Sequence, residues 1–95
     1  GTYNIVAKNT GLCADVTYGG TEDWVPIQMY YCNGAGNQRF SLVDVTSGPV
    51  AYHAFEPAHV SGFCLRVDPR GPQTRTASIL QFHCNGDAAE HWRWS

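Results

Sequence analysis

Four cysteines carry the most reactive side chains in this sequence, at Cys13, Cys32, Cys64 and Cys84. A cysteine can act as a nucleophile, ligate a metal or form a disulfide, and number and spacing help to decide among these roles. The spacings of 19 and 20 positions do not suit a zinc knuckle. An even number of cysteines in a short chain instead predicts disulfides, for which four residues allow three pairings. Disulfides form in an oxidising compartment, so we expect a secreted, extracellular protein.

The four histidines, His53, His59, His83 and His91, are scattered along the chain, and no carboxylate lies at metal-ligand spacing from them. We interpret them as surface or interface residues and expect neither a metal site nor a cofactor. The sequence has no Gly-x-Ser-x-Gly elbow, phosphate-binding loop or His-Glu-x-x-His motif. We therefore expect a protein that is not an enzyme.

The composition is that of one small globular domain. Of the 95 residues, 43% are hydrophobic and 15% are charged. The net charge is −2 and Lys8 is the one lysine, so no basic cluster is present to bind nucleic acid or an anionic membrane. No apolar run approaches the roughly 20 residues of a membrane-spanning helix, and the amino terminus lacks the pattern of a signal peptide. We expect a processed, soluble chain with no nucleic-acid partner and no membrane insertion.

The sequence repeats itself. Residues 11–16 match residues 62–67 at an offset of 51, and Cys-Asn-Gly at 32–34 recurs at 84–86 at an offset of 52. Gln28 falls on Gln81 at an offset of 53, which implies two residues gained before this glutamine and one lost after it. We define repeat one as residues 1–47 and repeat two as residues 48–95. Two copies of one fold should close the same bond, so the repetition predicts disulfides within the 13/32 and 64/84 pairs.

Within each repeat the apolar residues alternate or form short runs between Gly, Pro, Asn and Asp, which is typical of strands. The predicted strands are 3–7, 12–17, 27–32, 39–43, 50–55, 63–67, 79–84 and 91–94. Asn33-Gly34 and Asn85-Gly86 are strong turn dipeptides, because both residue types tolerate positive φ. We therefore predict an all-β fold with four strands per repeat.

Three elements in order, Gly-Leu-Cys-x-Asp-Val, Gln-x-aromatic-x-Cys-Asn-Gly and Asn-Gln-x-aromatic, resemble the ricin B-chain lectin repeat with its Gln-x-Trp element. The resemblance covers nearly the whole chain. It implies a β-trefoil, in which three four-stranded units surround a pseudo-threefold axis, and non-catalytic binding of galactose-like or other glycans.

The third unit of a trefoil is missing from this sequence. Either the chain is a piece of a longer lectin, or several copies associate to supply the missing strands. Unpaired strand edges and an uncovered apolar face favour a homo-oligomer.

Sugars present hydroxyls and one apolar face, so a sugar site needs convergent polar groups and an aromatic platform. The resemblance implies such a site in repeat one for a glycan or simple sugar. There, Asp15 and Asn37 would bind adjacent hydroxyls, Gln28 and Gln38 would hold the site in shape, and Tyr30 would stack on the ring.

Alternatives remain open for several residues of this site. Asp15 could be a turn carboxylate at a strand end, and Tyr31 could face the sugar instead of Tyr30. Gln38 could be a structural element that bonds the backbone. Trp24, in the loop 19–26, could extend the sugar platform, whereas the turn explains Asn33 adequately.

Repeat two departs from this pattern. The residues in the places of the Asp, Asn and Gln of repeat one are Arg66, Ala89 and Glu90. Gln81 persists, and either Phe82 or His83 takes the aromatic place. We expect this repeat to keep the scaffold without the sugar, the alternative being that Arg66 meets an acidic glycan.

The sequence therefore predicts a carbohydrate-binding module that acts through repeat one. The alternative is a secreted protein-binding module, such as an inhibitor or toxin subunit, on the same scaffold.

Overall fold

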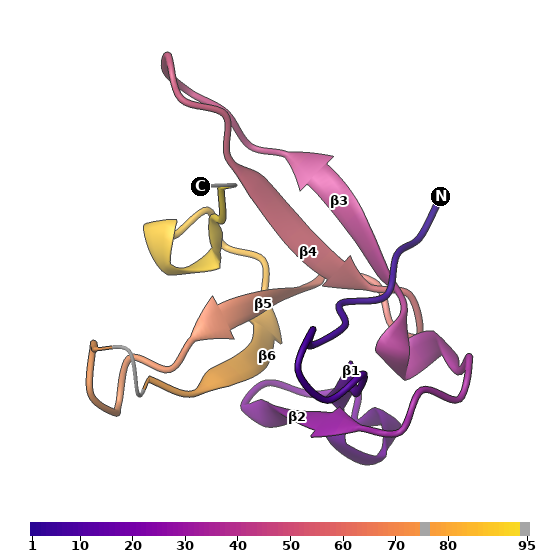
Figure 1. The fold of residues 1–95 in the computed structure, drawn as a ribbon. Helices are drawn as coiled ribbons and strands as arrows, with labels where there is room; N and C mark the ends of the chain where they lie inside the picture. The colour runs from indigo at the N-terminus through magenta and orange to yellow at the C-terminus, as the bar shows by residue number, and fades with distance from the viewer. Residues whose placement is uncertain (75–76, 94–95) are drawn as a thin grey trace.

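The computed structural model describes residues 1–74 and 77–93 and is built from short strands and single 3-10 turns (Figure 1). The elements in chain order are β1 (Cys13–Val16), η1 (Thr17–Gly19), β2 (Val25–Tyr30), η2 (Gly36–Gln38), β3 (Phe40–Asp44), β4 (His53–Pro57), β5 (Phe63–Val67), β6 (Ile79–His83) and η3 (Ala88–Glu90). The all-β prediction is confirmed.

The strands form two antiparallel sheets. The larger has the order β1-β2-β6-β5, so the hairpins β1–β2 and β5–β6 meet where β2 pairs with β6. The smaller consists of β3 and β4, and the loop between them extends away from the other strands (Figure 1). Each sheet therefore contains strands from both halves of the chain.

Two predicted strands are reduced to isolated bridges, one near each end of the chain. In segment 3–7, Tyr3 pairs with Phe40 and Val6 with Cys13. In segment 91–94, Trp92 pairs with His53, and residue 94 lies outside the described residues. Isolated bridges do not define a strand, so segment 3–7 is an irregular edge that contacts both sheets, and Trp92 is bridged to the two-stranded sheet.

The predicted strand 50–55 begins later than expected, at His53. Polar side chains close the preceding loop: Asp44 accepts a hydrogen bond from the Thr46 N–H at 2.9 Å, and the Thr46 hydroxyl accepts one from the Tyr52 N–H at 3.0 Å. These local side-chain bonds stabilise a turn in place of a longer sheet ladder.

The two hairpins correct the sequence alignment of the repeats. Asp15 lies opposite Gln28, whereas Arg66, at the place of Asp15, lies opposite Leu80. Gln81 therefore corresponds to Met29 and not to Gln28, and the offset is 52 throughout β2 and β6. A single residue inserted in the loop before β6 accounts for both hairpins, so the prediction of a two-residue gain followed by a loss was wrong.

Each hairpin is closed by a disulfide. Cys13 is bonded to Cys32 and Cys64 to Cys84, each with a Cα–Cα distance of 5.2 Å, so the predicted pairings are confirmed. In the chain-entropy model, closing a loop of about 20 residues stabilises the fold by roughly 3 kcal/mol. Such covalent bonds matter in a chain too short to bury a large core.

The hydrophobic core is small. Its buried members are Ala14, Val16, Phe40 and Leu65, with partly buried Ile5, Val25, Ile27, Phe55, Ile79 and Trp92 around them. Phe55 and Trp92 meet edge to face with ring centroids 6.4 Å apart, and the Trp92 indole N–H donates to the Leu65 carbonyl at 3.3 Å. This hydrogen bond connects Trp92, after η3, to β5.

Candidate carbohydrate site

A polar cavity of about 270 Å³ lies beside the hairpin β1–β2. Its lining residues are Asp15, Tyr18, Gln28, Tyr30, Asn33 and Asn37. Four of the five residues predicted for the sugar site are among them. The fifth, Gln38, is completely buried behind Asp15.

The register of the hairpin gives it two chemically different faces. Directly opposed residues share a face, so Asp15 and Gln28 lie on the same side as Tyr30, which is opposite Cys13. Ala14 and Met29, one position along, lie on the other side. One face of the hairpin is therefore polar and carries the cavity, while the other joins the core.

Asp15 is the most tightly held polar group in the cavity. Its Oδ1 accepts a hydrogen bond from Gln28 Nε2 at 3.1 Å, and its Oδ2 accepts one from Gln38 Nε2 at 2.9 Å. Only 3% of the residue is exposed, and no ion pair among the described residues involves it. Each carboxylate oxygen can accept more than one hydrogen bond, so Asp15 retains acceptor capacity in a fixed orientation.

Gln38 connects three segments around the site. Its Nε2 also donates to the Tyr31 carbonyl at 2.8 Å, and its Oε1 accepts from the Asn33 N–H at 2.9 Å. One side chain therefore bonds the backbone and also holds the carboxylate of Asp15.

Asn33 and Asn37 approach the cavity from the turn that follows β2. The Asn33 side chain accepts a hydrogen bond from the Ala35 N–H at 2.9 Å, and Gly34 adopts a φ of 75°. This arrangement confirms the predicted turn, but Asn33 also lines the cavity, which the sequence analysis missed. Asn37, in η2, donates from Nδ2 to the Val16 carbonyl at 3.0 Å, which fixes its amide beside Asp15.

Three tyrosines lie in or near the cavity. Tyr30 lines it, whereas Tyr31 packs edge to face against Tyr30, with ring centroids 5.7 Å apart, and is not among the lining residues. Tyr18 also lines the cavity, is 99% exposed and has a φ of 54°, a conformation that few non-glycine residues adopt. The sequence analysis did not select Tyr18. The available signal was an aromatic residue placed before two glycines immediately after β1.

In the second half, the corresponding place is occupied by an ion-pair cluster. Arg66 Nη1 lies 2.9 Å from Asp87 Oδ2 and 3.8 Å from Glu90 Oε2, and its guanidinium lies over the Phe82 ring at 4.9 Å. Phe82 is opposite Cys64 and so takes the place of Tyr30, while His83 follows it. Of the two residues that the sequence left open for the aromatic position of repeat two, Phe82 and not His83 therefore corresponds to Tyr30.

Glu90 and Gln38 share one contact with the backbone. Glu90 Oε1 accepts from the Asn85 N–H at 3.0 Å, as Gln38 Oε1 accepts from the Asn33 N–H. The central charge has the opposite sign in the two halves. The cation Arg66 faces the carboxylate of Glu90 in the second half, whereas the anion Asp15 faces the amide of Gln38 in the first. The scaffold is the same in both halves, but the Arg66 cation is already paired within the protein.

Trp24 does not line the cavity beside Asp15. Its ring meets Phe82 edge to face at 4.8 Å and lies under the Arg70 guanidinium at 3.9 Å. The predicted extension of the first sugar platform was therefore wrong, since the Trp24 loop packs on the second half of the chain.

The neighbouring Asp23 connects the same loop to His83 in β6. One carboxylate oxygen accepts from the His83 N–H at 2.8 Å, and the other lies 3.1 Å from His83 Nδ1. Desolvation tends to raise the pKa of Asp23, but the hydrogen bonds and charge of His83 outweigh it and hold the pKa below its ordinary value.

One group of potential metal ligands, Glu56, Cys64 and Cys84, comes together among the described residues. Its two sulfurs are joined in a disulfide and are not available as thiolates. No helix in the described part of the chain has the length and apolar character needed to cross a bilayer.

Comparison with known proteins gives the family and the fold of the chain. The model of the ricin-type beta-trefoil lectin domain matches residues 1–95, and the chain belongs to that family. The family is one of carbohydrate-binding modules that are generally non-catalytic.

A solved structure similar to this chain is that of a designed 3-fold symmetric protein, ThreeFoil. The identity is 30% and the TM-score 0.86, over 98% of this chain and 63% of ThreeFoil. The β-trefoil architecture is thereby confirmed, and the chain spans somewhat less than two thirds of that structure. The comparison with curated proteins gave no match.

Proposed function

We propose that this chain is a lectin module that binds a galactose-like or other glycan in the cavity beside β1–β2. The observation that supports this most strongly is Asp15, a carboxylate fixed by two glutamine amides at the edge of a cavity that also contains tyrosine rings. An ionised acceptor forms stronger hydrogen bonds than a neutral one, which suits a ligand that must give up its water.

We assign three roles to the residues that line the cavity or lie directly behind it. Asp15 and Asn37 bind adjacent sugar hydroxyls, and Tyr30 stacks on the apolar face of the ring. Gln28 and Gln38 keep the carboxylate in place. Tyr18 forms a further aromatic wall of the same cavity.

We expect the second half of the chain to bind no sugar. Arg66 is neutralised by Asp87, with Glu90 close by, and Ala89 has no polar group to replace the amide of Asn37. An acidic glycan would have to displace Asp87 from the guanidinium, which weakens the alternative role of Arg66.

The two disulfides are those expected of a protein from an oxidising compartment, and we propose that the chain functions outside the cell. A single shallow sugar site binds weakly. We therefore also propose that the chain works as a homo-oligomer, in which several sites engage a glycan-bearing surface together.

A glycan array probed with the labelled chain tests the proposed function. Signals that a free sugar competes away would support it. Silence across the array, combined with capture of a protein partner that depends on Tyr18 and Tyr30, would favour the protein-binding alternative.

A further inference from the structure

Tyr18 lies at the rim of the polar cavity beside β1–β2. It is among the residues that line this cavity, yet it is 99% exposed, whereas Tyr30 on the same cavity is 49% exposed. A side chain that lines a cavity and is almost fully exposed lies at its edge, with nearly the whole ring open to a ligand. Tyr30 is therefore the inner aromatic residue of the cavity and Tyr18 the outer one.

The backbone of Tyr18 is held in a conformation that is unfavourable for a residue with a side chain. Its φ of 54° and ψ of 20° lie in the left-handed helical region, where the Cβ atom comes too close to the backbone. Glycine adopts this region without that cost, and the next two residues, Gly19 and Gly20, are glycines. A ring so exposed gains almost no burial in return. Folding alone therefore does not account for a tyrosine here, whereas a ligand that covers the ring would.

The loop that carries this tyrosine, residues 17–24, is fixed by contacts with the second half of the chain. The Gln81 side chain, which is completely buried, donates to the Gly20 and Glu22 carbonyls at 3.1 and 3.0 Å. His59 Nε2 lies 2.7 Å from the same Gly20 carbonyl. A sparsely populated backbone conformation persists only where its surroundings fix it, and these contacts do so. The exposed ring therefore projects from a fixed backbone.

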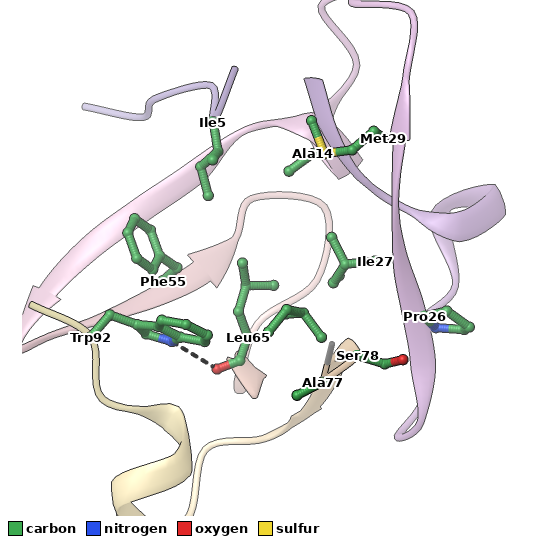
Figure 2. Close-up of a pocket in the computed structure, with 11 residues that line it drawn as sticks. Ile5, Ala14, Pro26, Ile27, Met29, Phe55, Leu65, Ala77, Ser78 and Trp92 are labelled. Carbon is green, nitrogen blue, oxygen red and sulfur yellow. Dashed lines mark hydrogen bonds between the residues drawn. The ribbon is translucent and has the colours of Figure 1, made fainter. Parts of the chain in front are cut away.

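A larger, apolar cavity does not offer a second place for sugar. It has a volume of about 520 Å³ and opens on the other face of the hairpin β1–β2 (Figure 2). Its described lining residues are Ile5, Ala14, Pro26, Ile27, Met29, Phe55, Leu65, Ala77, Ser78, Ile79 and Trp92. Only Ser78 and Trp92 among them have a side-chain nitrogen or oxygen, and the Trp92 indole N–H already donates to the Leu65 carbonyl at 3.3 Å. A glycan longer than one sugar must therefore leave the polar cavity over its own rim, where Tyr18 lies.

We propose that Tyr18 stacks on a second sugar ring, next to the ring bound by Asp15, and that the chain therefore prefers an oligosaccharide to the monosaccharide. This inference rests on the lectin function proposed above. The polar cavity, at about 270 Å³, lies just below the roughly 300 to 1,000 Å³ typical of ligand sites, so it accommodates a small ligand such as one sugar ring. The next ring lies outside it, where an exposed aromatic ring can cover the apolar face of the sugar.

NMR titration of wild type and Tyr18→Gly with matched pairs of sugars tests the proposal. The pairs are galactose and galactobiose, xylose and xylobiose, and mannose and mannobiose, and the measured quantity is the Kd for the monosaccharide divided by the Kd for the disaccharide. For a pair that binds, this ratio should be about twofold to tenfold larger in wild type than in Tyr18→Gly, the effect of one specific aromatic contact. The statistical advantage of a disaccharide, which offers two rings to the Asp15 site, is common to both proteins and cancels. Equal ratios in the two proteins would overturn the proposal.

Two further variants show whether the ring at position 18 is responsible. Tyr18→Phe keeps the ring and should keep the wild-type ratio. Tyr31→Ala is the matched control and should also keep it, because Tyr31 is 75% exposed but is not among the lining residues. A ratio lowered by either substitution to that of Tyr18→Gly would overturn the proposal. If Tyr18→Gly does not fold, Tyr18→Asn takes its place, because asparagine also tolerates positive φ and has no ring.

Failure of this inference and failure of the lectin function are distinguishable. Binding of a monosaccharide that Asp15→Ala abolishes, with equal ratios in wild type and Tyr18→Gly, would overturn this inference alone. Absence of binding to all six sugars would overturn this inference and, together with a silent glycan array, the lectin function as well.

Discussion

Gln38 and Asp15 meet at 2.9 Å in the first half of the chain, where Glu90 and Arg66 occupy the corresponding places in the second half at 3.8 Å. In both halves the residue from the 3-10 turn is buried and accepts a backbone N–H with its Oε1. The same scaffold thus carries an anion in one half and a cation in the other. Asp15 can still accept hydrogen bonds beside the cavity, whereas Arg66 already forms an ion pair with Asp87.

This relationship predicts that Gln38→Ala will destabilise the fold and abolish sugar binding together. The substitution leaves the Asn33 N–H and one oxygen of Asp15 without a partner, at roughly 1 to 3 kcal/mol for each buried group. Glu90→Gln is the control, because it changes the corresponding residue of the second half to the amide that Gln38 carries. It should leave sugar affinity unchanged. Denaturant unfolding and sugar titration measure the two effects. A stable Gln38→Ala chain with normal sugar affinity would show that Gln38 does not hold Asp15 in place.

The two neighbouring tyrosines should behave differently. Tyr30→Ala removes the ring that lines the cavity and is expected to weaken sugar binding by about twofold to tenfold, the equivalent of the roughly 0.5 to 1.5 kcal/mol of a specific aromatic contact. Tyr31→Ala should have little effect, because its ring is mostly exposed and lies outside the cavity. A larger loss for Tyr31→Ala than for Tyr30→Ala would reverse the assignment.

The Asp23–His83 contact predicts a pH-dependent contribution to stability. The folded state lowers the pKa of Asp23 below 3.8, so its stabilising effect is present above that pH and is lost as the pH falls through the folded pKa. Wild type should therefore melt above Asp23→Asn near pH 6, and the gap in Tm should close toward pH 2. A Tm difference that is constant over this range would contradict the pKa argument.

Much of the fold followed from local patterns that the three-dimensional structure preserves. The alternation of apolar residues, the Asn-Gly turns and the repeated cysteines identified the hairpins and the disulfides because each depends on near neighbours in the sequence. The segments 3–7 and 91–94 were expected as full strands, but their described residues pair through isolated bridges, and two of these, Tyr3 to Phe40 and His53 to Trp92, join residues far apart in the sequence.

The misaligned glutamine had a different cause. Gln28 and Gln81 are the same residue type, but strand alternation places Gln28 on the polar face and Gln81 on the opposite face, where it bonds the loop of the other half. A one-residue shift in a strand exchanges the two faces, and residue identity alone does not reveal it. Trp24 was misjudged for a similar reason, because its partners Phe82 and Arg70 lie far along the sequence.

The central claim is that sugar binds through Asp15 in the first half of the chain and not through Arg66 in the second. Calorimetric titration of a sugar selected on the array into wild type, Asp15→Ala and Arg66→Ala tests it most directly, with each variant first checked for folding. Loss of a charge-assisted acceptor, worth roughly 1.5 to 3 kcal/mol, should weaken binding to Asp15→Ala by about tenfold to over a hundredfold. Arg66→Ala should bind as wild type does, although its stability should fall because Glu90 loses its nearby cation. Normal binding by Asp15→Ala together with loss of binding by Arg66→Ala would contradict the account and place the site in the second half.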